Sequence, residues 1–541
     1  MPAQAPPPPT SMINPPGSRA PALAALLGLL LLAAALTGCG SLPTAAQRSV
    51  SQALPPSPTS PLVQTAARSA PSQDLTGVRL LPLGLHALDA RLQLIDRARH
   101  SLDVKYYVFD NDSTGRLVLA RLASAAARGV RVRLLVDDLY TTHTDALLRA
   151  AAALPNVEVR LFNPFCCARS SGLAGRFTAS LFDVYRLNHR MHNKLLVADG
   201  AMAITGGRNI ADDYFQRGSQ HHFIDLDALF VGAAVVDLVT TFDRYWNSPQ
   251  VLPVELVSHS DLPPDALRER FAALIADART AAPLQMPALD ALGYGPVGPE
   301  LDDGRLALIW GRAVVLVDPP DKGVRDADLA WKDSLAYQAL MKIWTAERDV
   351  VITSPYLIPG PLGIGAFEAL GRRQVRVTVL TNSLAATDEP LVHTGYARYR
   401  PRLIDAGVQL YELVPSRTQQ TKRLGVFGSS SGRLHAKTAV VDGDKSFIGT
   451  MNLDPRSRTQ NTELGVFVES RALASEMLRV IDANREQSAY RVRRAPGSGQ
   501  LQWLARDGDQ VETVHDIEPE STLWLRLHNL LLGVLVPEQL L

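Results

Sequence analysis

Apolar stretches of strand length alternate with stretches of helical periodicity from about residue 77 onward. Apolar residues at every second position favour a half-buried strand, and apolar residues three and four apart favour a helix. In the first part of the chain the strand-like segments are 102–109, 130–136 and 157–162, and the helical segments are 85–99, 114–128 and 145–153. Strands that alternate with helices predict an α/β fold class, with βαβ units and a parallel-rich sheet.

The same order of segments recurs later in the chain. Strand-like residues at 350–353, 375–380 and 408–411 match the three strands above, and residues 435–452 match residues 192–209. These four matching segments are offset by 243 to 251 residues. An internal duplication is the simplest explanation of this repeat. We therefore expect two similar halves that pack with pseudo-two-fold symmetry around a shared core or interface.

The repeat suggests where the parts of the chain begin and end. We expect a first half at residues 77–247, an inter-repeat insertion at 248–310 and a second half at 311–490. A C-terminal extension follows at 491–541, and its Leu-rich tail carries Trp524. Such a tail either lies in a membrane interface or packs as a helix against the core.

The first 76 residues have a different character. An apolar Ala/Leu stretch at 20–36 ends in Leu36-Thr37-Gly38-Cys39, which resembles the lipobox of bacterial lipoproteins. We expect residues 1–39 to be a signal peptide with a lipobox and Cys39 to be acylated. The protein would then be lipid-anchored in a bacterial cell envelope, on the periplasmic side of the inner or the outer membrane. The alternative is that this stretch is a plain transmembrane anchor. Residues 40–76, rich in Ser, Pro, Ala and Gln, predict a disordered linker.

Composition and charge exclude few classes of protein function. The 541 residues include 46% hydrophobic and 20% charged residues, which is ordinary for a globular protein, and the net charge is +1. This balance offers no electrostatic support for a nucleic-acid partner. Because Cys166 and Cys167 are adjacent and Cys39 is expected to be modified, the three cysteines build no disulfide framework or zinc site by ordinary spacing.

Two copies of a short polar pattern stand out within the repeat. His192 and Lys194 are two residues apart, as are His435 and Lys437, so in a strand each pair would share one face. In both copies an Asp follows the Lys by five residues, a Gly follows that Asp by seven, and an Asn follows the Gly by three. These residues are Asp199, Gly206 and Asn209 in the first copy and Asp442, Gly449 and Asn452 in the second.

This pattern resembles the HKD motif of the phospholipase D superfamily, and most closely that of bacterial cardiolipin-synthase-like members. The resemblance rests on the two motif regions, residues 186–213 and 429–456, on 223–227 and on 157–165, and it extends from about residue 77 to the C-terminus. It implies two α/β/α sandwich halves with a single active site at their interface. The candidate catalytic residues carried over are His192, Lys194, Asp199, His435, Lys437 and Asp442, although the family's motif Asp is usually held to be a structural ion-pair anchor.

The residue types suit phosphoryl chemistry. The two lysines can neutralise the non-bridging oxygens of a phosphodiester, and Asn209 and Asn452 can bind the phosphate through hydrogen bonds. One neutral histidine would form a covalent phosphohistidine, and the other would act as acid and then as base. We assign His192 as the nucleophile and His435 as the acid, and the pseudo-symmetry leaves the reverse assignment open. Asp225 and Glu463, on the strand after each motif, are candidates to fix the histidine tautomers. This chemistry requires no metal and no cofactor.

The expected activity is transfer of a phosphatidyl group between glycerophospholipids, most simply to phosphatidylglycerol to give cardiolipin. Water in place of the acceptor alcohol would make a phospholipase D hydrolase that releases phosphatidic acid, and the sequence does not separate the two. Alternatives of other classes are a secreted nuclease of the same superfamily and a non-catalytic envelope lipoprotein. The expected partner is a phospholipid membrane, nucleic acid is not expected, and protein partners and oligomeric state stay open.

Overall fold

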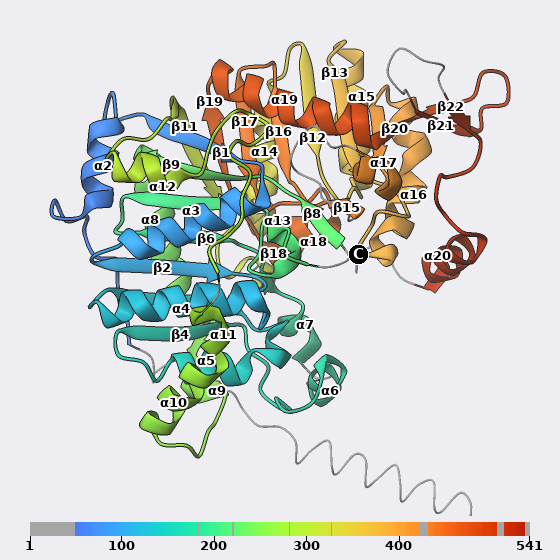
Figure 1. Ribbon diagram of the computed structural model, residues 1–541. Helices are drawn as coiled ribbons and strands as arrows, with labels where there is room; N and C mark the ends of the chain where they lie inside the picture. The colour runs from blue at the N-terminus through green and yellow to red at the C-terminus, as the bar shows by residue number, and fades with distance from the viewer. Residues whose placement is uncertain are drawn as a thin grey trace, which may run out of the picture.

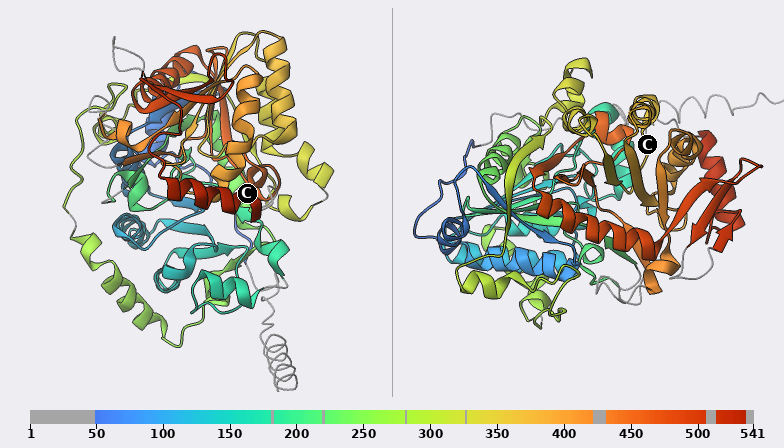
Figure 2. Two further views of the ribbon diagram at one scale, coloured as in Figure 1. Left: turned by 90° about the vertical axis from the view of Figure 1, so that its right-hand side faces the viewer. Right: turned by 90° about the horizontal axis from the view of Figure 1, so that it is seen from above.

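Two mixed β-sheets, one from each half of the chain, form the centre of the molecule. The computed structural model describes residues 49–180, 183–218, 221–280, 282–325, 327–420, 431–505 and 513–535. In Figure 1 the first half is coloured blue to green and the second half yellow to red. Figure 2 shows from above that the two halves lie side by side.

The first sheet contains eight strands, of which three come from the βαβ segments expected from the sequence. Their spatial order is β10 (Val251–Pro253), β4 (Val157–Phe162), β3 (Arg131–Asp137), β2 (Ser101–Tyr106), β6 (Leu195–Ala198), β7 (Met202–Gly206), β9 (Asp227–Gly232) and β1 (Thr76–Leu81). Only β2, β3 and β4 run parallel to one another; the other neighbours are antiparallel. The sheet is therefore mixed rather than parallel-rich, because β7 pairs antiparallel with β6, to which a short turn joins it, and with β9, from which residues 207–226 separate it.

Helices cover both faces of this sheet. α3 (Gly84–Arg97), α4 (Ser113–Ala127) and α5 (Asp145–Ala151) pack on one face, and α8 (Ala233–Trp246) packs on the other. The alternation of β6 shows the two faces: Leu196 belongs to the core under α3 and α4, whereas Leu195 and Val197 belong to the core that contains α8.

The second sheet repeats this order and continues into the C-terminal region. It runs β11 (Ile309–Val317), β19 (Leu464–Glu469), β17 (Lys445–Gly449), β16 (Thr438–Val441), β12 (Asp349–Thr353), β13 (Arg376–Asn382), β14 (Gln409–Leu413), β20 (Ala489–Arg494), β21 (Leu501–Ala505) and β22 (Thr513–His515). α14 (Leu335–Trp344), α15 (Gly360–Arg372) and α16 (Pro390–Asp405) pack on one face, and α19 (Arg471–Ser488) packs on the other. The expectation of a duplicated α/β fold is confirmed.

One strand and one core join the halves. Residues 309–311 of β11 pair with β1 of the first sheet, and residues 312–317 pair with β19 of the second. A shared hydrophobic core draws Val235 and Leu238 from α8 and Leu473 and Met477 from α19. Because the sheet hydrogen bonds and this core both cross the boundary, the halves form one body.

The insertion and the C-terminal extension both pack on the halves. α10 (Pro264–Leu274) lies against α5, and α12 (Val297–Asp302) lies against α3; α9 (Val254–Val257) and α11 (Ala276–Arg279) complete the insertion. α20 (Leu523–Leu535), near the C-terminal end, packs on α16. Among the helices that the structure describes, none has the length and apolar character needed to span a bilayer.

The expectation of a disordered linker at residues 40–76 is wrong for the part that begins at residue 49. α2 (Pro61–Ser69) is a capped helix, and the buried Ser60 hydroxyl before it donates to Asp199 at 2.5 Å. Arg133 donates to the Ser51 carbonyl oxygen at 3.1 Å. Composition did not reveal these contacts, because they bind the segment to residues distant in sequence. Residues 1–48, which include the predicted signal peptide and Cys39, lie outside the described part.

Candidate active site

Each motif histidine is held in place by the opposite half of the chain. β5 (Arg190–Met191) precedes His192 and pairs with β18 (Asn461–Thr462), while β15 (Ser431–Leu434) precedes His435 and pairs with β8 (His221–Ile224). The His192 backbone N–H donates to the Thr462 carbonyl at 2.9 Å, and the His435 N–H donates to the Ile224 carbonyl at 2.7 Å. Neither histidine would be positioned in an isolated half.

The carboxylates expected to orient the histidines do so across the boundary between the halves. His192 Nδ1 lies 2.9 Å from Glu463 Oε2, and His435 Nδ1 lies 2.6 Å from Asp225 Oδ2. A carboxylate acceptor favours the tautomer with the proton on Nδ1, which leaves Nε2 with a free lone pair. Sequence spacing indicated the four residues but not that each histidine would take the other half's acid.

The carboxylates are ionised and the histidines are neutral in the free site. Burial alone would raise the pKa of Asp225, but the hydrogen bond from His435 and the positive charges of Lys437 and Arg208 lower it to about 2. Burial would likewise raise the pKa of Glu463, but His192 and Lys194 lower it. Burial lowers the pKa of both histidines, to about 4 for His192.

A single cavity of about 450 Å³ brings the two histidines together. It lies between the halves and is lined by His192 and His435, by Asn209 and Asn452, and by Tyr107, Tyr140, Tyr214 and Tyr356. The histidines are 6% and 5% exposed, so each ring meets solvent only through this cavity. The two motifs therefore serve one site rather than two.

The motif lysines lie directly behind the histidines. Lys194 Nζ donates to the His192 carbonyl at 2.7 Å, and Lys437 Nζ donates to the His435 carbonyl at 2.5 Å. Both amines are buried, which lowers the pKa of Lys194 to about 7 and that of Lys437 to about 8. Neither lysine is among the residues that line the cavity, so their charges act on it from its wall.

The motif asparagines reach the cavity with different partners. Asn209 Nδ2 donates to the Tyr214 hydroxyl at 2.8 Å, and its Oδ1 accepts the Val108 N–H at 3.2 Å. Asn452 Oδ1 is buried and has no hydrogen-bond partner among the described residues. An unpaired amide oxygen that lines a cavity is available to a hydrogen-bond donor of a ligand.

The motif aspartates are bound by backbone N–H groups. Asp199 accepts backbone N–H bonds from Arg99, His100 and Ser101, and Asp442 accepts the equivalent three from residues 347–349. Both lie in turns with left-handed φ, 51° and 53°. They fasten the turn after the motif strand to the start of the neighbouring strand and do not line the cavity. These contacts favour a supporting role over a catalytic one, because motif membership alone does not distinguish the two.

Several site residues were not singled out from the sequence as part of the chemistry. The rings of Tyr107 and Tyr214 lie edge-on to His192 and His435, at centroid distances of 4.9 and 5.1 Å. Tyr356 donates to Asp388 at 2.8 Å. Tyr107 and Tyr356 occupy matching strand ends, which is a usable signal, whereas nothing in the sequence relates Asp388 to the motifs.

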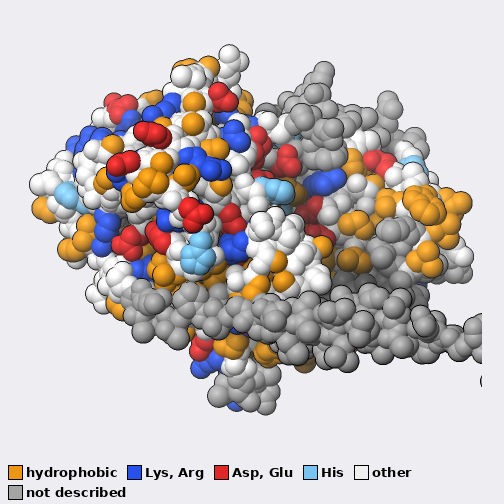
Figure 3. Space-filling view, turned by 90° about the horizontal axis from the view of Figure 1, so that it is seen from below, with side chains coloured by type: hydrophobic (Ala, Val, Ile, Leu, Met, Phe, Trp, Pro, Cys, Tyr) orange, Lys and Arg blue, Asp and Glu red, His pale blue; other side chains and the backbone are white. Residues whose placement is uncertain are grey.

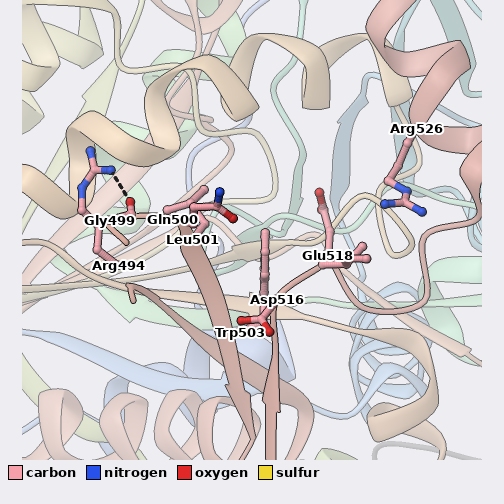
Figure 4. Close-up of a pocket in the computed structure, with 9 residues that line it drawn as sticks. Arg494, Gly499, Gln500, Leu501, Trp503, Asp516, Glu518 and Arg526 are labelled. Atoms are coloured by element: carbon pink, nitrogen blue, oxygen red, sulfur yellow. Dashed lines mark hydrogen bonds between the residues drawn. The ribbon is translucent and has the colours of Figure 1, made fainter. Parts of the chain in front are cut away.

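A second hollow lies apart from this site. It has a volume of about 490 Å³ and is lined by C-terminal residues such as Arg494, Trp503 and Arg526. Figure 4 shows that Arg494 turns to the Gly499 carbonyl, which it contacts at 2.9 Å, and that Arg526 lies well apart from it. No histidine lines this hollow, so it offers no nucleophile of the kind that the motifs supply.

A duplicated α/β fold whose two His-x-Lys motifs meet at one cavity defines an enzyme of the phospholipase D superfamily. The family described as "Cardiolipin synthase, PLD-like domain" matches residues 92–246 and 340–484. The chain is 39% identical to cardiolipin synthase C of Escherichia coli over 473 residues, which is 85% of this chain and 96% of that protein. It is 26% identical to a cardiolipin synthase of Staphylococcus aureus, over 73% of this chain and 64% of that protein.

A solved structure supports the fold independently of close sequence similarity. The phosphatidylserine synthase of Haemophilus influenzae matches with a TM-score of 0.53 and 14% identity, over 88% of this chain and 100% of that one. The protein belongs to the family of cardiolipin synthases with PLD-like domains. Its two family matches fall within the two halves, and together they contain all four residues of the crossed acid–histidine pairs.

Proposed function

We propose that this protein is a phosphatidyltransferase that works through a phosphohistidine and makes cardiolipin from phosphatidylglycerol. The observation that carries the proposal is the pair of histidines on one cavity, each bound at Nδ1 by a carboxylate of the opposite half. This geometry leaves two Nε2 atoms for one phosphorus. The names of the family and of its relatives support a phospholipid substrate.

In the first step, His192 Nε2 attacks phosphorus and the bond from phosphorus to the leaving alcohol breaks. A protonated His435 delivers its proton to that alcohol. In the second step, His435 takes the proton of the incoming glycerol hydroxyl, the new phosphorus–oxygen bond forms, and the bond to His192 breaks. The anionic phosphodiester supplies the charge that raises the pKa of His435 once the substrate is bound.

The carboxylate environments support His192 as the nucleophile and His435 as the acid. Asp225 Oδ2 accepts a bond from His435, and its Oδ1 accepts the Leu226 N–H. Glu463 instead shares its two oxygens between His192 and the hydroxyls of Thr450 and Ser457. The more dedicated acid suits the histidine that must become a cation, and the low pKa of His192, about 4, suits a neutral nucleophile.

Membrane association is part of the proposal. We expect acylated Cys39 to anchor the chain on the periplasmic side of a membrane in the bacterial cell envelope. The outward face of α20 adds a candidate contact, because Leu523, Trp524 and Leu531 are well exposed. Hydrophobic side chains gather at the right-hand edge of the face shown in Figure 3, on the side where Figure 1 places α20.

Lipid analysis of the purified protein tests the proposal. The protein is incubated with phosphatidylglycerol, with and without phosphatidylethanolamine and with and without chelator, and the products are identified by mass spectrometry. Cardiolipin formed despite chelator supports the transferase. Phosphatidic acid alone would make the protein a hydrolase, and cleaved DNA with neither lipid product would make it a nuclease.

Variants of the two histidines complete the test. His192→Ala and His435→Ala should each abolish conversion, and a phosphoprotein should be trapped in the wild type but not in His192→Ala. His259→Ala is the matched control, because His259 is exposed in the inter-repeat insertion. Full lipid conversion by both site variants would contradict an enzymatic role for this site.

A further inference from the structure

A narrow apolar groove of about 120 Å³ lies between α14 and α15. Ala336, Ala339 and Ile343 line it from α14, and Leu362, Ala366 and Phe367 line it from α15. Only three polar residues, Asn452, Asp454 and Arg458, contribute to the lining. Leu362 is 65% exposed, so one end of the groove reaches the surface.

The groove adjoins the catalytic cavity. Asn452 and Asp454 line both, so the groove begins beside the motif asparagine of the second half. A smaller cavity of about 20 Å³ shares Ala339 and Ile343 with the groove and reaches Lys437. An apolar groove that begins beside a candidate phosphate-binding residue and reaches the surface suits a ligand that is polar at one end only.

In the first half the corresponding space is filled by a side chain. Phe215 ends the 3-10 helix η4 (Asp212–Phe215), which contacts both α3 and α4, the helices that correspond to α14 and α15. Its ring is completely buried in the first-half core. His192 and His435 are 243 residues apart, and the same offset relates Phe215 to Arg458. Arg458 lies in α18 (Pro455–Thr459), is partly exposed and lines the groove. The duplication therefore has a plug in one half and an open groove in the other.

We propose that this groove binds an acyl chain of the glycerophospholipid whose phosphate lies between the two histidines. The inference rests on the proposed function and adds to it where the apolar part of the substrate goes. An acyl chain is tethered to the phosphate by the glycerol, so it can enter a groove that opens beside Asn452. The other possible occupant of an apolar groove is a helix of another protein. Such a helix need not contact the catalytic cavity, and filling the groove would then leave the chain-length preference of the enzyme unchanged.

Closing the groove with the first half's own plug provides the test. Arg458→Phe places at this position the residue that the other half accommodates, and Ala366→Phe fills the groove from α15. We compare kcat/KM for dioleoyl and dihexanoyl phosphatidylglycerol. Each buried methylene changes affinity about fourfold, so both variants should lower the long-chain to short-chain ratio by about tenfold or more.

Two matched variants separate filling from other effects. Arg458→Gln removes the charge without filling the groove and should keep the chain-length preference of the wild type. Ala369→Phe lies one turn further along α15, outside the groove lining, and should convert both lipids as the wild type does. An unchanged ratio in both filling variants, or an equal loss on both lipids in both, would overturn the acyl groove. A wild type that converts neither lipid would instead overturn the proposed function.

Labelling of the wild-type protein gives a readout that needs neither turnover nor a variant that folds. Phosphatidylglycerol with a diazirine in its acyl chain is bound to the full-length protein, irradiated and mapped by peptide analysis. Label within residues 331–344 or 360–372 supports the groove. Label found only on other peptides would contradict it.

Discussion

Burial works against the positive charges of Lys194 and Lys437. The pKa of Lys194 falls to about 7 and that of Lys437 to about 8, first because of burial, while Glu463 and Asp225 respectively oppose the shift. A lysine with a lowered pKa loses its charge at a lower pH than usual. The site therefore keeps the ammonium groups that a phosphate needs only up to near-neutral pH.

This shift predicts that kcat/KM declines as pH rises through about 7 to 8. The free enzyme loses the positive charge of Lys194 first and that of Lys437 next, and each loss weakens stabilisation of the phosphoryl oxygens. On the acid side the rate should fall only toward pH 4, where His192 becomes protonated. Measuring kcat/KM for short-chain phosphatidylglycerol over a range of pH tests both the decline at high pH and the decline at low pH. A rate that keeps rising to pH 9 would contradict a role for the charged lysines.

Neutralising the acids should reduce the chemical step without preventing binding. Glu463→Gln and Asp225→Asn keep the shape of each side chain but remove the carboxylate that fixes the Nδ1 tautomer. We expect kcat to fall by about 10²- to 10⁴-fold with KM within a few-fold. Glu469→Gln is the control, because Glu469 is exposed at the end of β19, the strand that begins directly after Glu463. Wild-type kcat in Glu463→Gln would show that the His192 tautomer does not depend on this acid.

At the level of elements, α2 is attached to the rest of the protein through a motif aspartate. The Ser60 hydroxyl accepts from the N–H groups of Leu62 and Val63 and donates to Asp199, whose carboxylate also binds the backbone at residues 99–101. One buried carboxylate thus joins α2, the turn after β6 and the start of β2. The motif Asp supports the site through these elements rather than through the substrate.

Ser60→Ala should therefore destabilise the fold more than it lowers activity. The change removes a helix N-cap and one hydrogen bond to a buried carboxylate, so the free energy of unfolding should fall by about 1–3 kcal/mol. Denaturant titration measures this loss, and kcat should stay within about twofold because the cavity residues are untouched. Ser72→Ala, at an exposed position after α2, is the control. Equal stability of both variants would mean that α2 is not held through Ser60.

At the scale of the whole molecule, the shared core predicts that the halves unfold together. Leu238→Ala on α8 leaves a cavity in the core that also contains α19, at a cost of about 2–5 kcal/mol. Calorimetry should show a single transition that moves to lower temperature as a whole. Two transitions, with only one displaced by the substitution, would contradict a common cooperative unit.

The sequence predicted local patterns well and contacts between the halves poorly. Strand periodicity and the repeated His-x-Lys spacing identified the duplicated fold, both histidines and both lysines, because these signals lie within short segments. The exchange of Asp225 and Glu463 between the halves depends on packing that spacing does not record. The ordered segment around Ser60 was missed for the same reason, since its partner is Asp199.

Strand β11 completes the first sheet and begins the second, and this has a consequence for how the protein is made. When residue 317 has emerged from the ribosome or a translocation channel, the outer edge of residues 312–317 has no partner until β19 appears near residue 464. At roughly 5–20 residues per second this interval is on the order of ten seconds. A nascent chain then displays an unpaired hydrophobic strand edge, which can pair with another chain. Biogenesis of this enzyme should consequently depend on a chaperone far more than the refolding of a finished chain does.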